Sequence, residues 1–282
     1  MGETTQTTDT RPWLLLSPSL FAITVLVVIP MAFILVYSFY ENVDLAVDRV
    51  AFQFGNWNEF LTDSYYHTAI WKTLRLSLIV TFLAAVLGYI PAYFIAMTKF
   101  RDKWLLLLLL ILPFWISFII RTLSWIHIFG NQGALNGLFQ LLGLTDAPLS
   151  LMYNEFTVIV GFIHVFLPYM ILNIYVSMEG IDENFEPAAR TLGATPWQAF
   201  REVTLPLSMP GLAAGCLLVF VLTGGSYVTP LILGGPGDFL FGNLIYDAVV
   251  SELNWPMGAT LSFTLLFLLG LVVVLYSRLM GL

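Results

Sequence analysis

Residues 104–129 read WLLLLLLILPFWISFIIRTLSWIHIF, and Arg121 is the one formally charged side chain in this run. A bilayer core about 30 Å thick is crossed by roughly 20 apolar residues in a helix. The run is long enough for that crossing and carries few polar groups. It therefore predicts a transmembrane helix.

Five further apolar runs extend this prediction to the whole chain. With the first run they predict an all-α membrane protein of six transmembrane helices. The expected spans are 13–40, 73–97, 104–129, 156–177, 209–233 and 255–277. Proline interrupts five of these runs, which a membrane bundle tolerates because neighbouring helices and hydroxyl side chains satisfy the freed carbonyls. These prolines are Pro30, Pro91, Pro113, Pro168 and Pro230.

The composition excludes several other classes of protein. Of the 282 residues, 59% are hydrophobic and only 10% are charged, against about 25% charged residues in a soluble domain. A net charge of -7 with eleven Lys and Arg excludes a nucleic-acid-binding surface, which needs clustered basic side chains. Cys216 is the single cysteine, so an intrachain disulfide is excluded.

The basic residues between the spans predict the orientation, because positively charged flanks stay cytoplasmic. One side collects Arg11, Lys99, Arg101, Lys103, Arg190, Arg201 and Arg278. The other side holds Arg49, with Lys72 and Arg75 at the start of the second span, among many acids. We therefore expect both termini in the cytoplasm, residues 1–12 as a cytoplasmic tail and residues 13–282 as the transmembrane domain.

Arg121 and His164 are polar residues inside predicted spans. A rise of about 1.5 Å per residue from Trp104 places Arg121 roughly 25 Å along the third span, near its outer end. A charge inside a span is a candidate functional residue, although an interface arginine that snorkels or pairs with an acid would fit as well. His164 is expected to form a hydrogen bond between helices, because no second ligand lies at metal spacing on its span. We therefore predict no metal site.

The connection between the fourth and fifth spans differs from the other cytoplasmic loops. Residues 178–211 read MEGIDENFEPAARTLGATPWQAFREVTLPLSMPG. Pro187 fits only the first turn of a helix, so a short helix should start close to Glu186. Gly193 suits the left-handed residue that closes such a helix.

A second short helix should follow directly. Thr195 with Gln198 three residues later forms a capping-box pattern, and Pro196 suits the first helical position. Pro206 and Pro210 are expected to end this helix before the fifth span. The pair of helices would make either a lever that another protein can push or a simple amphipathic surface hairpin.

The sequence AARTLGA at 188–194, followed by Leu-Pro, resembles the EAA loop of ABC importer permeases. In that family the loop marks the coupling helix that docks into the ATPase subunit. The matching residues are Ala188, Ala189, Gly193, Leu205 and Pro206. Pro187 occupies the family's Glu position and Glu186 lies one place earlier, about 100° around a helix. The resemblance implies a type I ABC importer permease fold with a coupling loop at about 178–207.

Other segments along the chain look like the spermidine/putrescine-type permeases. They are LGYIPAYFIA at 87–96, LPFWISFIIR at 112–121, GALN at 133–136, LPLSMPGLAAGCLLVF at 205–220 and NWPMGA at 254–259. This resemblance implies an inner-membrane importer with a second permease, two ATPase subunits and an extracytoplasmic substrate-binding protein. Polyamines are the expected cargo, and opines, thiamine and ferric iron stay open because related subgroups share the pattern.

Two rival functions find less support in the sequence. An enzyme of the bilayer needs a nucleophile or metal ligands, and neither HExxH nor GxSxG occurs. An ion-coupled secondary transporter usually carries carboxylates at the midplane, and these spans have none. No Walker A pattern occurs either, so we expect ATP and Mg to be bound by a separate ATPase subunit and no cofactor in this chain.

A polyamine path through the spans would need aromatic faces and a few carboxylates. The candidates within spans are Phe114, Trp115, Arg121, Trp125 and Tyr227, and those at the outer mouth are Glu155, Asp247 and Glu252. Ordinary helix packing would explain each aromatic residue equally well.

Overall fold

The computed structural model describes residues 11–44, 47–98 and 103–280, which form two compact units. The first unit contains residues 11–44, 47–62 and 247–264, and the second contains 63–98, 103–246 and 265–280. Most of the predicted tail, residues 1–10, lies outside the described residues, as do Lys99 and Arg101.

The first unit begins with the first predicted span, which is confirmed as a continuous helical run. It comprises α1 (Arg11–Ile23), a π-helical segment (Thr24–Val28) and α2 (Ile29–Tyr37). An antiparallel hairpin of β1 (Glu41–Asp44) and β2 (Val47–Arg49) follows, and then α3 (Gly55–Thr62). The all-α prediction therefore holds for the spans, and a small hairpin is added in a connecting loop.

Ser38 is the polar centre of this first unit. Its backbone carbonyl accepts hydrogen bonds from Asn56 Nδ2 at 2.9 Å and from Thr260 Oγ1 at 3.3 Å. Its hydroxyl accepts a bond from Trp57 Nε1 at 3.1 Å. Buried polar groups need such partners, so these bonds fix the end of α2 against α3 and the start of α14 (Trp255–Met280).

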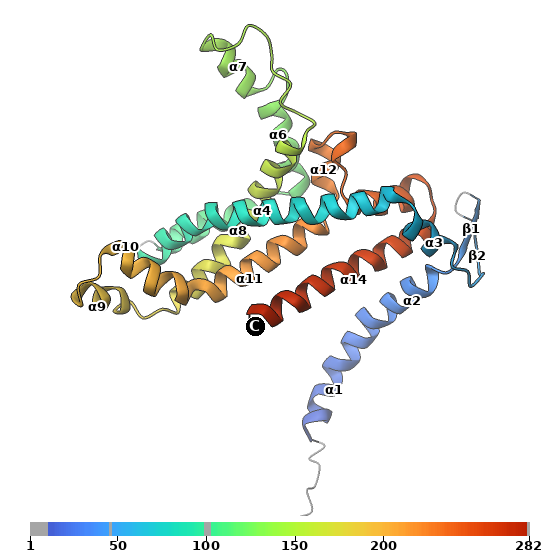
Figure 1. The fold of residues 1–282 in the computed structure, drawn as a ribbon, viewed down its shortest axis with the longest axis horizontal. Helices are drawn as coiled ribbons and strands as arrows, with labels where there is room; N and C mark the ends of the chain where they lie inside the picture. Colours follow the sequence, from blue (N-terminus) through green and yellow to red (C-terminus); the bar gives the residue numbers. More distant parts are fainter. Residues whose placement is uncertain (1–10, 45–46, 99–102, 281–282) are drawn as a thin grey trace, which may run out of the picture. The chain divides into compact units, whose positions relative to one another are not determined.

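The second unit is built on three long helices, α4 (Ser64–Met97), α8 (Glu155–Glu179) and α11 (Leu205–Gly224), which pack against one another (Figure 1). Their contact surfaces form its hydrophobic core, with fully buried side chains such as Val80, Phe162, Met170, Ile174 and Val219. The second, fourth and sixth predicted spans are confirmed as α4, α8 and α14. Pro91 and Pro168 lie inside α4 and α8, as a membrane bundle permits.

Small residues bring α8 and α11 unusually close together. A Cβ at Gly211 of α11 would lie 2.4 Å from the Asn173 carbonyl oxygen and 2.3 Å from Ser177 Cβ. One turn further along, a Cβ at Gly215 would lie 2.7 Å from Met170 Sδ. Helices in membranes associate through such close packing of their backbones. The hydrophobic effect does not drive them together, because lipid is as apolar as their side chains.

The third predicted span is broken, which corrects the prediction of one straight helix. It consists of α5 (Lys103–Ile111), a 3-10 turn (Leu112–Trp115) and α6 (Phe118–Phe129), followed by α7 (Ala134–Leu141). The two halves bend by 91°, and α6 and α7 rise away from α4, α8 and α11 in Figure 1. Pro113 has no backbone N–H to donate, and Ile116 adopts extended backbone, so the helical ladder of backbone hydrogen bonds cannot continue. The predicted depth of Arg121, which assumed a straight helix, therefore does not hold.

The fifth predicted span ends earlier than expected. α11 stops at Gly224, and residues 228–233 form a separate helix, α12 (Val228–Leu233). Two consecutive glycines, Gly224 and Gly225, each cost a helix about 1 kcal/mol relative to alanine, which favours a stop there. A short 3-10 turn (Pro236–Asp238) and α13 (Phe241–Tyr246) complete the second unit. Among the described residues, five helices are long and apolar enough to cross a membrane, or six with the bent pair.

Gly211→Ala should destabilise the transporter by about 1–3 kcal/mol, because the added methyl group must push the Asn173 backbone away. Gly270→Ala in α14 is the matched control, since a Cβ there meets nothing within 4 Å. The measurement is thermal unfolding of the detergent-purified protein. Equal melting temperatures for the two variants would contradict the close α8–α11 contact.

Candidate functional site

The predicted first helix of the connecting loop is confirmed as α9 (Phe185–Thr191), with Pro187 in its first turn. Gly193 follows with φ +98°, the left-handed conformation that glycine adopts at low cost. Its N–H donates to the Arg190 carbonyl and the Ala194 N–H donates to the Ala189 carbonyl, each at 3.1 Å. These bonds satisfy carbonyls at the end of α9 and fix the turn.

The predicted capping box is also confirmed. Gln198 N–H donates to Thr195 Oγ1 at 3.3 Å, and Thr195 N–H donates to Gln198 Oε1 at 2.8 Å. The second helix, however, does not stop at Pro206 or Pro210. α10 (Pro196–Ala199) continues through a π-helical segment (Phe200–Thr204) directly into α11. Pro206 is the second residue of α11, so its missing N–H falls at the junction with the π-helical segment, where the hydrogen-bond ladder is irregular.

Phe200 connects this loop to α4. Its ring makes edge-to-face contacts with Tyr89 at 5.7 Å and Tyr93 at 5.5 Å, measured between ring centroids. The Trp197 ring stacks on Phe200, with the ring centroids 5.4 Å apart. The Tyr89 hydroxyl also lies 2.7 Å from the Ser208 hydroxyl on α11. We call Tyr89, Tyr93, Trp197 and Phe200 the aromatic seat.

The loop exposes large apolar side chains outside the long helices. Leu192 is 90% exposed and Trp197 is 67% exposed, and Phe185 is exposed as well. Ala188 and Gly193, two of the family-matching residues, lie exposed among them. Exposed apolar side chains gathered in this way are typical of a surface that binds another protein.

Glu186, the displaced acid, lies on the inner side of α9. It is half-buried and accepts a long hydrogen bond from the Tyr93 hydroxyl at 3.4 Å. A cavity of about 590 Å³ opens beside it, and its lining includes Lys103, Glu179 and Arg190. Lys103 is paired with Glu179 across this cavity. Glu186 therefore contacts α4 rather than the exposed surface of the loop.

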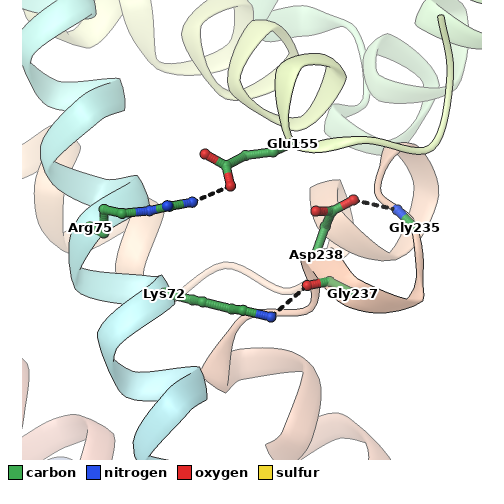
Figure 2. A network of polar contacts seen from close by, with 6 residues as sticks. All are labelled: Lys72, Arg75, Glu155, Gly235, Gly237 and Asp238. Atoms are coloured by element: carbon green, nitrogen blue, oxygen red, sulfur yellow. Dashed lines mark hydrogen bonds and ion pairs between the residues drawn. The ribbon is translucent and has the colours of Figure 1, made fainter.

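A network of charged residues lies toward the other end of α4, away from the aromatic seat (Figure 2). Arg75 of α4 forms an ion pair with Glu155 at the start of α8. Lys72 Nζ donates to the Gly237 carbonyl at 2.7 Å, and Asp238 accepts from the Gly235 N–H at 2.8 Å. Glu155, which the sequence suggested as a carboxylate for cations, is thus held by a cation of its own chain.

The structure gathers three of the predicted path residues, Phe114, Arg121 and Trp125. The Arg121 guanidinium lies 5.8 Å from the Phe114 ring centroid, and Phe114 packs edge-to-face on Tyr169 at 4.8 Å. Trp125, one helical turn after Arg121, donates from Nε1 to His164 Nδ1 at 3.1 Å. The predicted interhelical hydrogen bond of His164 is therefore confirmed.

Trp115 and Tyr227, the other aromatic candidates of this unit, do not share these contacts. Trp115 is 80% exposed, and Tyr227 stacks on Tyr246 at 5.1 Å. Asp247 and Glu252 belong to the other compact unit, where Asp247 accepts a bond from the Ser251 hydroxyl at 3.3 Å. Within the described residues, no group of three His, Cys, Asp or Glu could hold a metal ion.

Sequence reasoning missed the aromatic seat, although one signal was available. Tyr89 and Tyr93 are four residues apart and therefore share a helix face. Nothing in the sequence, however, connects that face with Phe200, more than a hundred positions away. Tyr169 was missed for the same reason.

The described helices and the structured loop between two of them define a multi-pass membrane transport component. The chain belongs to the family described as "Binding-protein-dependent transport system inner membrane component", which matches it over residues 12–282. It is thus an inner-membrane protein of that family. Over 252 residues it is 35% identical to "Spermidine/putrescine transport system permease protein PotB" of Escherichia coli (strain K12), covering 89% of this chain and 91% of that protein.

Two solved structures show the same fold. One is the "Crystal structure of a bacterial ABC transporter involved in the import of the acidic polysaccharide alginate", with a TM-score of 0.78, 16% identity and coverage of 98% of both chains. The other is the "Crystal structure of bacterial alginate ABC transporter in complex with alginate pentasaccharide-bound periplasmic protein". Its TM-score is 0.75 at 17% identity, with coverage of 98% of this chain and 96% of that one. The fold is therefore that of an ABC importer permease.

Glu155→Gln should lower stability by no more than about 1 kcal/mol, because the Arg75 and Glu155 side chains are 48% and 40% exposed. The difference should fade in 1 M salt, where the screening length falls to about 3 Å. Thermal unfolding of Glu155→Gln, Arg75→Gln and the double variant measures the coupling. A salt-insensitive loss well above this size would show instead that the pair is shielded from water.

Proposed function

We propose that this chain is a transmembrane permease subunit of an ATP-driven importer for polyamines, spermidine or putrescine. The 35% identity to PotB across 89% of the chain carries this proposal. The quoted motifs that resemble spermidine/putrescine-type permeases support it further. The chain itself serves transport and leaves ATP hydrolysis to another subunit.

The proposed complex contains a second permease, two ATPase subunits and an extracytoplasmic substrate-binding protein. The family description, which names dependence on a binding protein, supports the last of these. The absence of a Walker A pattern from the sequence supports a separate ATPase that binds ATP and Mg. Both termini are proposed to be cytoplasmic, as the distribution of Lys and Arg favours. The loop at 178–207 then faces the ATPase.

In this proposal α9 and the following turn form the surface that the ATPase pushes. Leu192 and Trp197 are exposed and apolar, so they can be buried against a partner. Behind them, Phe200 is packed between Tyr89 and Tyr93 of α4. Force on the loop therefore reaches α4 through ring contacts and α11 through continuous helix.

The cargo path is proposed to include Phe114 and Trp125, whose rings lie on the broken third span. Faces of aromatic rings attract ammonium groups, with energies of about 0.5–2 kcal/mol per contact. Phe114 already contacts a cation, the Arg121 guanidinium, at 5.8 Å. Trp115 and Tyr227 are exposed. For these two residues, and for Asp247 and Glu252, a place on the cargo path stays a prediction.

The cargo is tested by ATPase stimulation of the reconstituted complex with loaded binding proteins for polyamines, opines, thiamine and iron. We expect stimulation by spermidine- or putrescine-loaded protein and uptake of the same polyamine into vesicles. The permease chain reconstituted alone should take up nothing, because it lacks a nucleotide site. Stimulation by another cargo, with none by polyamines, would refute the substrate while retaining the importer.

Gly193→Trp should abolish ATPase copurification and uptake at unchanged membrane levels. A side chain at φ +98° strains the backbone by about 1–2 kcal/mol, and the indole also covers the exposed apolar surface. Gly143→Trp is the matched control, because Gly143 has φ +67° and also has nothing within 4 Å of a Cβ. It should retain the ATPase.

Glu186→Ala should be milder than Gly193→Trp, because Glu186 contacts Tyr93 on the inner side of α9. The same copurification and uptake assays apply. Full ATPase retention in Gly193→Trp would remove the coupling role from this loop. A Glu186→Ala defect as severe as that of the tryptophan would show that the displaced acid contributes to docking.

A further inference from the structure

The third span changes direction before it can leave the bilayer. Lys103, at the start of α5, is paired with Glu179 at the end of α8, which is the cytoplasmic end of α8 in the proposed orientation. α5 has 9 residues and the 3-10 turn has 4, so together they rise by at most about 22 Å. The two residues before α6 add at most about 7 Å. The start of α6 therefore lies no farther out than the outer boundary of a hydrocarbon core about 30 Å thick.

From that depth α6 and α7 run along the membrane. The helices before and after the break are bent by 91°, and α6 and α7 leave the side of the bundle of α4, α8 and α11 in Figure 1. A straight helix would place Leu141 about 57 Å from Lys103, far outside the bilayer. With the observed bend, Leu141 stays near the depth at which α6 begins. We call residues 118–144 the lateral arm.

The lateral arm turns its one charged side chain toward the bundle. Arg121 is the only charged residue in the sequence from 104 to 145, and it is 8% exposed. The exposed side of α6 holds Ile119, Ile120 and Leu123 instead. An apolar outer side with the charge directed inward suits lipid, where a charged side chain is costly.

α7 is an amphipathic helix that exposes its apolar face. Leu138 lies three and four positions before Leu141 and Leu142, so the three share one face, and all are exposed. Asn136 and Gln140, four positions apart, lie on another face. A helix of this kind lies in the membrane interface with its apolar face among the acyl chains.

The tip of the lateral arm pairs its backbone groups internally. Asn136 is buried, and its Nδ2 donates to the carbonyls of Gly130 and Leu149 at 3.0 Å each. Its Oδ1 accepts from the Leu149 N–H at 2.8 Å, and the Gly133 N–H donates to the Gly130 carbonyl at 2.8 Å. A loop in water could leave these groups to the solvent, whereas irregular backbone near hydrocarbon needs partners within the protein.

The exposed apolar side chains of the lateral arm also point to lipid as their partner. They are all Leu or Ile, namely Ile119, Ile120, Leu123, Ile128, Leu138, Leu141, Leu142 and Leu144. Interfaces between proteins are enriched in aromatic residues, Met and Arg. None of these types occurs among the large exposed apolar side chains of the described arm.

We propose that the lateral arm lies in the outer leaflet of the bilayer, with the leucine face of α7 against phospholipid acyl chains. Which leaflet it occupies rests on the proposed orientation, whereas the contact with lipid does not. The surface gives lipid a direct contact with the span that carries Phe114 and Trp125, two residues of the proposed cargo path.

The test places a nitroxide spin label at Leu141→Cys in the complete complex, reconstituted in vesicles of phosphatidylethanolamine and phosphatidylglycerol. Cys216→Ala removes the one cysteine of this chain, and the other subunits are made without cysteines. Power saturation compares collisions with oxygen, which partitions into lipid, and with nickel-EDDA, which stays in water. The label at Leu141→Cys should favour oxygen several-fold. A label at Leu123→Cys on α6 should show the same preference, because the bend keeps both positions at one depth.

Asp146→Cys is the control, because Asp146 is exposed and is the first charged residue after Arg121. Its label should favour nickel-EDDA. A Leu141→Cys label that nickel-EDDA reaches as readily as the control would place the lateral arm in water and overturn the proposal. Few collisions with either reagent would show a protein partner instead and also overturn it. Neither measurement depends on the cargo, so a failure of polyamine uptake leaves this test intact.

Discussion

The close approach of α8 and α11 is the contact on which the second compact unit depends. Gly211 and Gly215 allow the backbone of α11 to lie against Asn173 and Met170 with no room for a side chain. Because α9, α10 and the turn at Gly193 connect these two helices, their separation sets the span of the loop. A wider spacing would move the exposed loop surface and separate Phe200 from α4. Packing between two membrane helices thus determines the geometry of a docking surface outside the membrane.

Irregular helical turns explain how this chain combines many prolines with long helices. A π-helical segment precedes Pro30 in the first unit and Pro206 in the second. In both places the proline is the second residue of the α-helix that directly follows the π-helical segment. Pro113 follows α5 without a π-helical segment and lies in a 3-10 turn that gives way to extended backbone at Ile116, and the chain bends there by 91°. The same residue type therefore preserves one span and breaks another, according to the helix that precedes it.

The contrast between these prolines shows which features of the fold could be predicted from the sequence and which could not. Among the described residues, apolar length located five helices that can cross a membrane and the bent pair that would be a sixth, because crossing a bilayer depends mainly on length and apolar composition. Local chemistry located Pro187, Gly193 and the Thr195 capping box, because those bonds join residues close in sequence. It failed at Pro206 and Pro113, where the outcome depends on how the neighbouring turns hydrogen-bond. Contacts between distant segments, such as Phe200 with Tyr89, have no local signature, and neither does the burial of Arg121.

A single helix, α4, contacts the charged network near its beginning and Phe200 of the aromatic seat near its other end. Near its beginning, Lys72 holds the loop at Gly237, and Arg75 holds the start of α8. Near its other end, Tyr89 and Tyr93 hold Phe200. An unbroken helix is stiff along its axis, so a displacement of Phe200 need not be absorbed on the way to Arg75. Two contacts near its beginning, the exposed Arg75–Glu155 ion pair and the Lys72 hydrogen bond, rearrange at low cost, whereas Thr73 accepts a buried hydrogen bond from the Phe241 N–H at 2.8 Å. Motion of the loop that reaches the beginning of α4 can therefore change the partners of Lys72 and Arg75 at low cost.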